Sequence, residues 1–239
     1  MCEPLARWMV VLQSTIGPFA CYRRGDIVCN TIRSKRTWEP DVLTALRPHM
    51  TPRTVFVDVG SNVGWYAYTV AQSHDVVAFE PFHKNLLLQN ATRCLQPDRA
   101  ARVRLLPYGL SDRAQACDLF QQEDVNHGDT HTVCTDAQRA AFSRKGYKRL
   151  GRASYARLDD VAWPALLAAD KVVKVDIEGH EYDMLRGATR FLAEGTPPRA
   201  WYVEVFQLGD KKAKVVDLFR ANGYELRSAP AANNYLFVR

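Results

Sequence analysis

From Thr54 onward, apolar strand-like runs alternate with longer segments of helical pattern. The four pairs, in chain order, are "TVFVDV" with "VGWYAYTVAQ", "DVVAFE" with "HKNLLLQNATRCL", "KVVKVD" with "GHEYDMLRGATRFL", and "AWYVEVF" with "DKKAKVVDLFRAN". Parallel strands are joined by crossovers that are usually helical, and they are buried on both faces. The alternation therefore predicts βαβ units and an α/β fold, in which helices cover both faces of a parallel sheet. The last two runs, "YELRSA" and "NYLFVR", flank a turn at 230–233 and predict a hairpin at the sheet edge.

Two regions interrupt this alternation. Residues 1–50 predict short strands and a helix near "EPDVLTALRPH", where Pro40 suits the first helical turn. Residues 107–170 form a long, weakly periodic insertion. A chain of 239 residues with 47% hydrophobic content lies within the range of a single α/β domain. We therefore expect one domain over 1–239, with an N-terminal cap at 1–50 and a core at 51–239 that carries the insertion.

The cysteines and the N-terminus bear on where the protein resides. No CxxC pair occurs among the six cysteines, so neither a zinc site nor a disulfide framework is predicted; they are Cys2, Cys21, Cys29, Cys94, Cys117 and Cys134. The apolar run "WMVVL" is too short for a signal-peptide core or a membrane span. These observations predict a soluble, cytoplasmic protein with reduced thiols.

The positive charge of the chain is concentrated in one segment. Between Arg139 and Arg157 there are seven basic residues and no acidic one, and the other 25 Lys and Arg balance 26 Asp and Glu. The aromatic residues Phe142, Tyr147 and Tyr155 are interleaved with this segment. It is either a solvated helix and loop, or a cap over a site for an anionic or sugar-like acceptor or a nucleic acid.

The stretch "VFVDVGSNVGWYAYTVA" predicts a strand, a glycine turn and a helix. Gly60 and Gly64 bracket the turn, and Glu80 follows Gly60 by 20 residues at the end of the next strand. An acidic residue at that spacing can accept hydrogen bonds from ribose hydroxyls. Asn62 occupies the middle glycine position, and a carboxylate at Asp58 would repel phosphates but attract the sulfonium or ammonium of S-adenosylmethionine. The alternative is that Asp58 only caps the backbone of the turn.

A second polar stretch, "KVVKVDIEGHEYDML", carries an unusual density of ionisable groups. Lys174 and Asp176 share one face of a buried strand by period two, so Lys174 needs a partner, for which we expect Glu204 in "WYVEVF". That pair is either structural or part of a site. With a helix beginning after Gly179, Glu181 is expected to face inward.

The remaining groups of this stretch have simpler interpretations. Glu178 is expected at the helix start, where the dipole favours a carboxylate, and Asp183 is expected to be solvated. His180 is either a base whose pKa a neighbouring carboxylate raises, or part of the polar surface. Asp176, Glu178 and Glu181 are candidates to orient an acceptor, or to hold a metal that does so. The loop "DVNHGDTH" holds Asp124, His127, Asp129 and His131 without a specific ligand spacing, so no metal site is predicted.

Six stretches taken together resemble the FkbM-like family of S-adenosylmethionine-dependent methyltransferases. They are "VFVDVGSNVGWYA", "VVAFEPFHKNLLLQN", "YGLSD", "LDDV", "VVKVDIEGHEYDMLRGA" and "WYVEV". The resemblance implies a Rossmann-like class I methyltransferase fold, with seven strands in the order 3-2-1-4-5-7-6 and the last-inserted one antiparallel. It implies a cofactor-binding set comprising Asp58, Gly60, Asn62, Gly64, Tyr66, Glu80 and Pro81, with Ser111 and Asp112 near the adenine. It also implies that Asn126 and Gly128 lie in a loop near the acceptor site.

Three functions are compatible with these residues. The leading hypothesis is O-methylation of a hydroxyl on a small molecule or glycan, with a catalytic set of Lys174, Asp176, Glu178, His180, Glu181 and Glu204. Methyl transfer from a sulfonium needs mainly positioning, with a base for a poorly acidic hydroxyl. The alternatives are an RNA methyltransferase that uses the basic segment 139–157, and a protein that binds S-adenosylmethionine without catalysis. The acceptor and the oligomeric state are not determined by the sequence.

Overall fold

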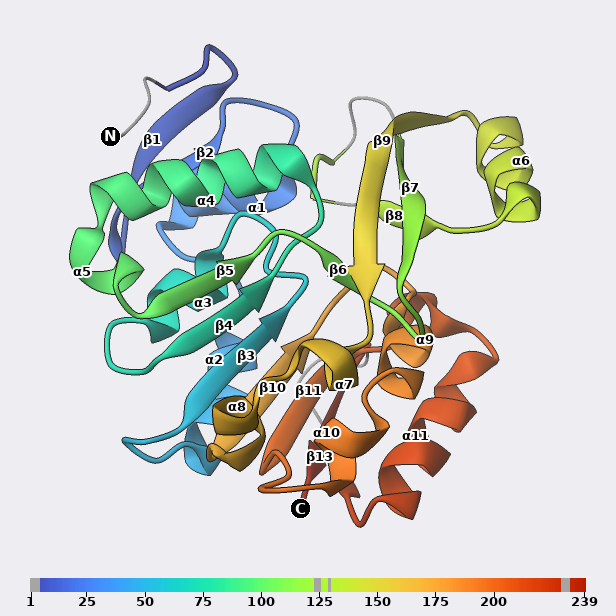
Figure 1. The fold of residues 1–239 in the computed structure, drawn as a ribbon. Coiled ribbons are helices and arrows are strands. Elements are labelled where there is room, and N and C mark those ends of the chain that lie inside the picture. The colour runs from blue at the N-terminus through green and yellow to red at the C-terminus, as the bar shows by residue number, and fades with distance from the viewer. Residues whose placement is uncertain (1–4, 123–125, 129, 229–232) are drawn as a thin grey trace.

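A seven-stranded sheet forms the centre of the computed structural model, which describes residues 5–122, 126–128, 130–228 and 233–239 (Figure 1). Its strands, in spatial order, are β12 (Glu225–Ser228), β13 (Asn234–Val238), β11 (Ala200–Glu204), β10 (Lys171–Val175), β3 (Val55–Val59), β4 (Val76–Phe79) and β5 (Val103–Leu106). β13 pairs antiparallel with β11 and β12, and the remaining pairs are parallel. The expected order 3-2-1-4-5-7-6 and the edge hairpin are confirmed; the turn predicted at 230–233 lies mostly outside the described residues.

Helices cover both faces of this sheet, as the alternation predicts. One face carries α1 (Ile27–Lys35), α2 (Pro40–Leu46), α3 (Trp65–Val70) and α4 (His83–Leu95). The other carries α7 (Leu158–Val161), α8 (Pro164–Ala168), α9 (Glu181–Arg186), α10 (Thr189–Ala193) and α11 (Lys211–Ala221). Successive strand residues divide between the two cores, since Phe56 and Val172 belong to the first and Val57 and Val173 to the second.

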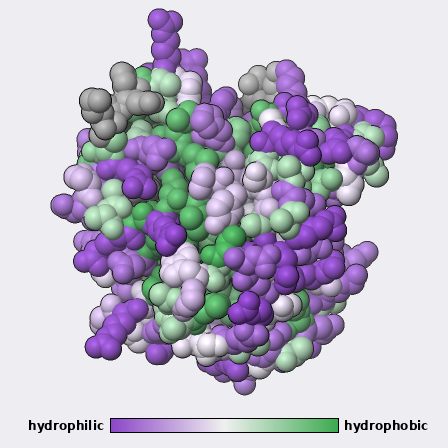
Figure 2. Space-filling view, in the orientation of Figure 1, coloured by the Kyte–Doolittle hydropathy of each residue, from purple (hydrophilic) through white to green (hydrophobic). Residues whose placement is uncertain are grey.

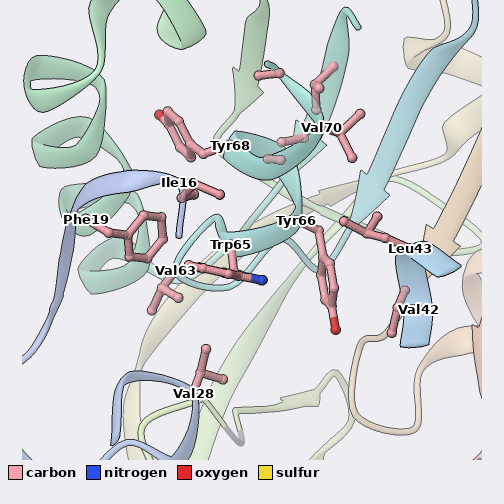
Figure 3. Packing of buried hydrophobic residues seen from close by; sticks show 14 of the residues in the cluster. Ile16, Phe19, Val28, Val42, Leu43, Val63, Trp65, Tyr66, Tyr68 and Val70 are labelled. Atoms are coloured by element: carbon pink, nitrogen blue, oxygen red, sulfur yellow. The ribbon is translucent and has the colours of Figure 1, made fainter. Parts of the chain in front are cut away.

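The first core also includes the N-terminal hairpin of β1 (Met9–Ser14) and β2 (Gly17–Tyr22). Phe19 packs edge-on against Trp65 with ring centroids 5.4 Å apart, and Figure 3 shows both side chains within this cluster. The hydroxyl of Tyr22 donates to Asn85 of α4 at 2.7 Å. Pro40 begins α2 as predicted, whereas the sequence pattern gave no sign of α1. The short η1 (Arg47–His49) follows α2 and leads to β3.

The insertion forms a second sheet that the sequence pattern did not predict. Its strands lie in the order β6 (Gly109–Leu110), β9 (Tyr147–Ala156), β7 (Gln115–Gln122) and β8 (His131–Val133), and α6 (Asp136–Arg144) precedes β9. Figure 1 shows this sheet and α6 to one side of the main sheet. Most residues of β9 are at least partly exposed, so no apolar alternation marks the strand.

The second sheet overturns the expectation of reduced thiols at two positions, and Cys94 of α4 is disulfide-bonded as well. Cys117 in β7 and Cys134 after β8 form a disulfide, with sulfurs 2.04 Å apart. The antiparallel register places Asp118 opposite Val133, so the two cysteines next to this pair lie close together. The cytoplasmic location inferred from reduced thiols therefore loses part of its basis and stays a prediction.

Two shorter elements, α5 (Pro97–Ala100) before β5 and η2 (Phe206–Leu208) after β11, complete the fold. In the orientation of Figure 1, Figure 2 shows a mostly hydrophilic surface with an apolar band near β5, which is an edge strand. Within the described ranges, none of the helices has the length and hydropathy needed to cross a membrane.

Candidate active site

The loops that follow β3, β4 and β10 line a partly open pocket, here called the central cavity. β3 lies between β4 and β10. The chain adds β4 and β5 on one side of β3 and then adds β10 and β11 on the other side, so the strand order reverses at β3. Open α/β sheets bind ligands at the carboxyl ends of the strands at such a switch point. Residues from all three loops line the cavity, among them Gly60, Asn62, Glu80, Pro81, Asp176 and His180.

The glycine turn after β3 lies against the loop after β10. Gly60 has a left-handed φ of +77°, and a Cβ built there would lie 1.9 Å from the carbonyl oxygen of Asp176. Gly64 precedes α3 with φ +91°, and its Cβ would lie 2.9 Å from Cγ of Gln89. Both positions therefore require glycine, which explains the spacing seen in the sequence. Two residues of the turn, Gly60 and Asn62, line the cavity.

Glu80 follows β4 and joins the turn to the cavity wall. Its side chain is buried, and its Oε2 and Oε1 accept the backbone N–H groups of Asn62 at 2.8 Å and Phe82 at 2.7 Å. Burial raises the pKa of Glu80 to about 7, although these hydrogen bonds favour the ionised form. The oxygen Oδ1 of Asn62 is also buried and has no hydrogen-bond partner among the described groups. A carboxylate and an orphaned amide oxygen in the turn fit the hydroxyl and amine donors of a nucleoside cofactor.

Lys174 pairs with Asp58, which corrects the expected pair with Glu204. Its Nζ lies 3.3 Å from Oδ1 of Asp58 and donates to the carbonyl oxygen of Gly60 at 2.7 Å. Burial disfavours the ammonium, but the carboxylates of Asp58 and Asp176 outweigh this and raise the pKa of Lys174. The strand register explains the choice, since Lys174 lies opposite Asp58 in β3 and opposite Tyr202, not Glu204, in β11.

Asp58 is fully buried beneath the turn and is not among the described residues that line the central cavity. Its carboxylate therefore balances Lys174. Tyr66 of α3 lies on the other side of this pair, with its ring centroid 5.4 Å from Nζ of Lys174. The Tyr66 hydroxyl lies 3.3 Å from Oε2 of Glu39, which precedes α2.

A second hollow, here called the side hollow, opens next to the central cavity. Four residues line both spaces: Asn62, Gly128, Asp176 and Glu178. The side hollow also has aromatic residues (Trp38, Trp65, Tyr66) and further carboxylates (Glu39, Glu204) in its wall. Asn126 lines it too, and its Oδ1 accepts from the N–H groups of Ile27 and Gly128 at 3.1 and 3.2 Å.

Asp176 and Glu204 form a carboxyl pair at the end of β10 and β11. The Asp176 side chain is 40% exposed and lies 3.7 Å from Nζ of Lys174. Burial, followed by repulsion from Asp176, Glu178 and Glu181, raises the pKa of Glu204 well above its usual range. This shift favours the protonated form of Glu204 beside Asp176.

Glu178 and Glu181 shape the loop after β10. Helix α9 begins at Glu181 with His180 at its N-cap, so the expectation that Glu178 starts the helix is wrong. Glu178 has a left-handed φ of +55°, and its Oε2 accepts from Nε2 of Gln207 at 2.5 Å. Glu181 is buried as expected, and its Oε1 accepts the N–H groups of Ile177 and Gly179 at 3.0 and 3.2 Å. Glu181 thus fixes the loop that carries Asp176 and Glu178.

His180 is held in place rather than exposed on the polar surface. Its Nε2 lies 3.0 Å from Oγ of Ser111 and its Nδ1 lies 3.7 Å from Oδ2 of Asp183. Burial lowers the pKa of His180 despite the nearby Asp183, so the expected upward shift is wrong. Asp183 is not simply solvated, because it forms an ion pair with Lys211 at 3.0 Å.

The residues expected near the adenine lie behind the cavity wall. Ser111 is buried against His180, and Asp112 pairs with Arg186 at 3.4 Å. Gly109 and Leu110, two residues earlier, line the central cavity instead. The insertion also supplies Thr130, Thr132 and Tyr155 to the wall, of which sequence reasoning identified only Tyr155, as part of the basic segment.

The basic segment is partly neutralised by local carboxylates. Arg139 and Arg149 both pair with Asp118, at 3.0 and 2.7 Å, and Arg157 pairs with Asp159 at 3.2 Å. Phe142, Lys145 and Tyr147 line a third hollow beside His180 and Glu178, which fits the expectation of a cap at this end of the sheet.

The His- and Asp-rich loop gives no support for a metal centre. Across the described ranges, no group of three His, Cys, Asp or Glu side chains is arranged to hold a metal ion. His127 stacks on Tyr22 with centroids 4.7 Å apart, and His131 packs against Phe142 at 5.1 Å. Asp124 and Asp129 lie outside the described residues.

Comparison with known proteins agrees with this geometry. The family profile described as the methyltransferase FkbM domain matches residues 58–226, which is more than half of the chain. The chain belongs to the FkbM methyltransferase family. The matched residues include the glycine turn, Glu80 and the loop after β10, so the family match covers the central cavity.

The chain is also similar to two further proteins. The hexuronic acid methyltransferase AglP of Haloferax volcanii is 30% identical over 156 residues, which cover 64% of this chain and 58% of AglP. The crystal structure of the FkbM methyltransferase from Methylobacillus flagellatus superposes with a TM-score of 0.57 at 15% identity, covering 89% of this chain and 52% of that one. The chain therefore spans little more than half the length of each of these two proteins, and it shares the class I methyltransferase fold of the second.

Proposed function

We propose that this protein is an S-adenosylmethionine-dependent O-methyltransferase that methylates a hydroxyl of a sugar or glycan. The observation that carries the proposal is that Asp176 lines both the central cavity and the side hollow. A carboxylate therefore stands where a methyl donor in one space would meet an acceptor in the other. AglP, by its name, acts on a hexuronic acid, which supports a sugar as the acceptor.

The central cavity is the proposed cofactor site. The Glu80 carboxylate would accept the ribose hydroxyls, and the backbone at Gly60 and Asn62 would lie against the remainder of the nucleoside. The chemistry that this cofactor supplies when bound is a methyl group already activated on a sulfonium. The protein then has to orient the acceptor, exclude water and take up one proton.

Asp176 is the proposed acceptor of that proton. A sugar hydroxyl is poorly acidic, so a carboxylate oxygen of Asp176 would take up its proton as the methyl group passes from the cofactor sulfur, which leaves as a thioether, to the hydroxyl oxygen. Glu204, whose protonated form burial favours, lies beside Asp176 in the wall of the side hollow. His180 is less suited to this role, because its Nε2 is engaged with Ser111 and burial lowers its pKa.

The partial neutralisation of the basic segment favours a sugar acceptor over RNA. Arg139, Arg149 and Arg157 each have a carboxylate partner within 3.2 Å. RNA binding would require these charges to be available to phosphates, and it would weaken steeply with salt.

Replacing Glu80 with glutamine tests the cofactor site. A hydrogen bond to a charged group contributes about 1.5–3 kcal/mol, so we expect S-adenosylmethionine affinity to fall roughly 10- to 100-fold in calorimetry. Because the pKa of Glu80 is about 7, wild-type affinity should rise as the pH increases from 6 to 8, where the stronger, ionised acceptor forms. The variant should lack this dependence. Glu194→Gln, on the exposed end of α10, is the control, and unchanged affinity in Glu80→Gln would refute the assignment.

Replacing Asp176 with asparagine tests the catalytic assignment. General-base catalysis contributes roughly 10²–10⁴-fold, so we expect release of S-adenosylhomocysteine to slow by at least about 100-fold while cofactor affinity is retained. Asp183→Asn is the control. Asp183 lies in α9 and is paired with Lys211, so this variant should keep its turnover. If wild-type protein binds the cofactor but never releases S-adenosylhomocysteine with any sugar acceptor, the non-catalytic alternative is correct instead.

A further inference from the structure

The side hollow has an acidic wall although the chain as a whole is basic. Its charged lining residues are four carboxylates and one lysine: Glu39, Asp176, Glu178, Glu204 and Lys174. The formal net charge of the full sequence is +6. The formal charge of the hollow's wall is therefore negative, opposite in sign to the net charge of the whole protein.

The lysine offsets only part of the charge of these carboxylates. Nζ of Lys174 lies 3.3 Å from Asp58, which is buried outside the hollow, and 3.7 Å from Asp176, and it donates a hydrogen bond to the carbonyl oxygen of Gly60. Its single positive charge is therefore shared between Asp58 and Asp176. An anionic ligand in the hollow would gain little from Lys174, because this cation already has a carboxylate partner.

The wall also holds carboxylates besides Glu204. Asp176 and Glu178 stand at the junction with the central cavity, and Glu39 faces them from the N-terminal segment. Burial and the nearby Asp176 raise the pKa of Glu39, which shows that these groups repel one another. Glu39 is held in this position by a left-handed backbone with φ +24° and by contact with the Tyr66 hydroxyl at 3.3 Å. A cation in the hollow would relieve the repulsion, and a carboxylate would increase it.

The aromatic wall is suited to the same kind of ligand. Trp38, Trp65 and Tyr66 line the hollow beside the carboxylates. Aromatic faces pack against the apolar faces of sugar rings and also attract cations. Lys174 illustrates this attraction, since its ammonium lies 5.4 Å from the Tyr66 ring centroid. A sugar that carries an amine would match both features.

We propose that the acceptor bound in the side hollow is an amino sugar, in which a protonated amine lies near the hydroxyl that is methylated. This inference rests on the proposed function, and it distinguishes the chain from AglP, which by its name acts on an anionic hexuronic acid. Trp38 and Glu39, which contribute to this wall, precede the residues 58–226 that match the family profile. The selection of acceptor charge therefore depends partly on a segment outside the matched domain.

The experiment compares three acceptors that share one ring. The methyl glycosides of glucosamine, glucose and glucuronic acid are each incubated with the full chain and S-adenosylmethionine, and kcat/KM is measured from S-adenosylhomocysteine release. We expect the order glucosaminide, glucoside, glucuronide, with at least a 10-fold difference between the first and the last. A flat or reversed order with measurable turnover overturns the inference and leaves the proposed function standing. Absence of turnover with all three, while the cofactor binds, overturns this inference; the proposed function itself is overturned only if no sugar acceptor yields S-adenosylhomocysteine.

A charge variant shows whether the order arises from the hollow. Glu39→Gln keeps the side-chain shape but removes one negative charge, so the glucosaminide-to-glucuronide ratio should fall about 5-fold or more. Glu194→Gln, which removes an exposed charge from α10, should leave the ratio unchanged. Equal ratios in wild type and Glu39→Gln would show that the side hollow does not set the preference.

Discussion

Replacing Gly60 with alanine is expected to abolish binding of S-adenosylmethionine and to lower the free energy of unfolding by about 2–5 kcal/mol. The added Cβ would lie 1.9 Å from the carbonyl oxygen of Asp176 and 2.7 Å from Cγ2 of Ile177. Because the first of these atoms is backbone, the whole loop after β10 must shift. The variant would therefore be strained by the left-handed backbone at position 60. It would also displace the side chains of Asp176 and Glu178 from the cavity.

Gly146 offers a matched control for this prediction. It has nearly the same backbone angle, with φ +80° against +77° for Gly60, but no described atom lies within 4 Å of a Cβ built on it. Gly146→Ala should therefore cost only the conformational term, about 1–2 kcal/mol, and leave cofactor affinity intact. Urea denaturation and calorimetry compare the two variants. Equal destabilisation would mean that the contact between the glycine turn and the loop after β10 contributes nothing.

The sequence was sufficient for the main sheet because its strands are buried on both faces. Val-rich runs such as 171–175 are fully buried, and burial is what makes an apolar run conspicuous in a sequence. β9, by contrast, is mostly exposed: only Tyr155 is buried, and charged residues occur along the strand. A half-exposed strand pairs through its backbone, which the side-chain pattern does not report. The second sheet and its disulfide were therefore missed together.

The sequence predicted only the part of the site that depends on features close together along the chain. Spacing along the chain identified Gly60 and Glu80, since a strand, a turn and the end of the next strand are local features. Partner choice across strands was not predictable. Period two placed Lys174 on the correct face, but both Asp58 and Glu204 occur on neighbouring strands, and only the register decides between them. The pKa of His180 was missed because its burial depends on Ser111 from a distant segment.

Replacing Lys174 with methionine is expected to lower the free energy of unfolding by about 3–5 kcal/mol. Methionine fills a similar volume, so the cost arises mainly from Asp58, whose fully buried carboxylate would lose its cation. Burial already raises the pKa of Asp58 with Lys174 present, and removing the ammonium must raise it further. An acid whose folded pKa is raised contributes stability at low pH that is lost as the pH rises through that pKa. The variant should therefore be less destabilised at pH 5 than at pH 8.

The double variant Asp58→Asn, Lys174→Met separates the charge effect from packing. With both charges removed, the uncompensated carboxylate no longer exists, so the double variant should be more stable than Lys174→Met alone at pH 8. Urea unfolding of the wild type, both single variants and the double variant gives the coupling energy directly. If Lys174→Met is no less stable than the double variant, and its stability does not change between pH 5 and 8, the ion pair beneath the glycine turn has no role in holding the fold. The expected result instead would show that this pair supports the turn carrying the cofactor site, because Lys174 also binds the carbonyl oxygen of Gly60.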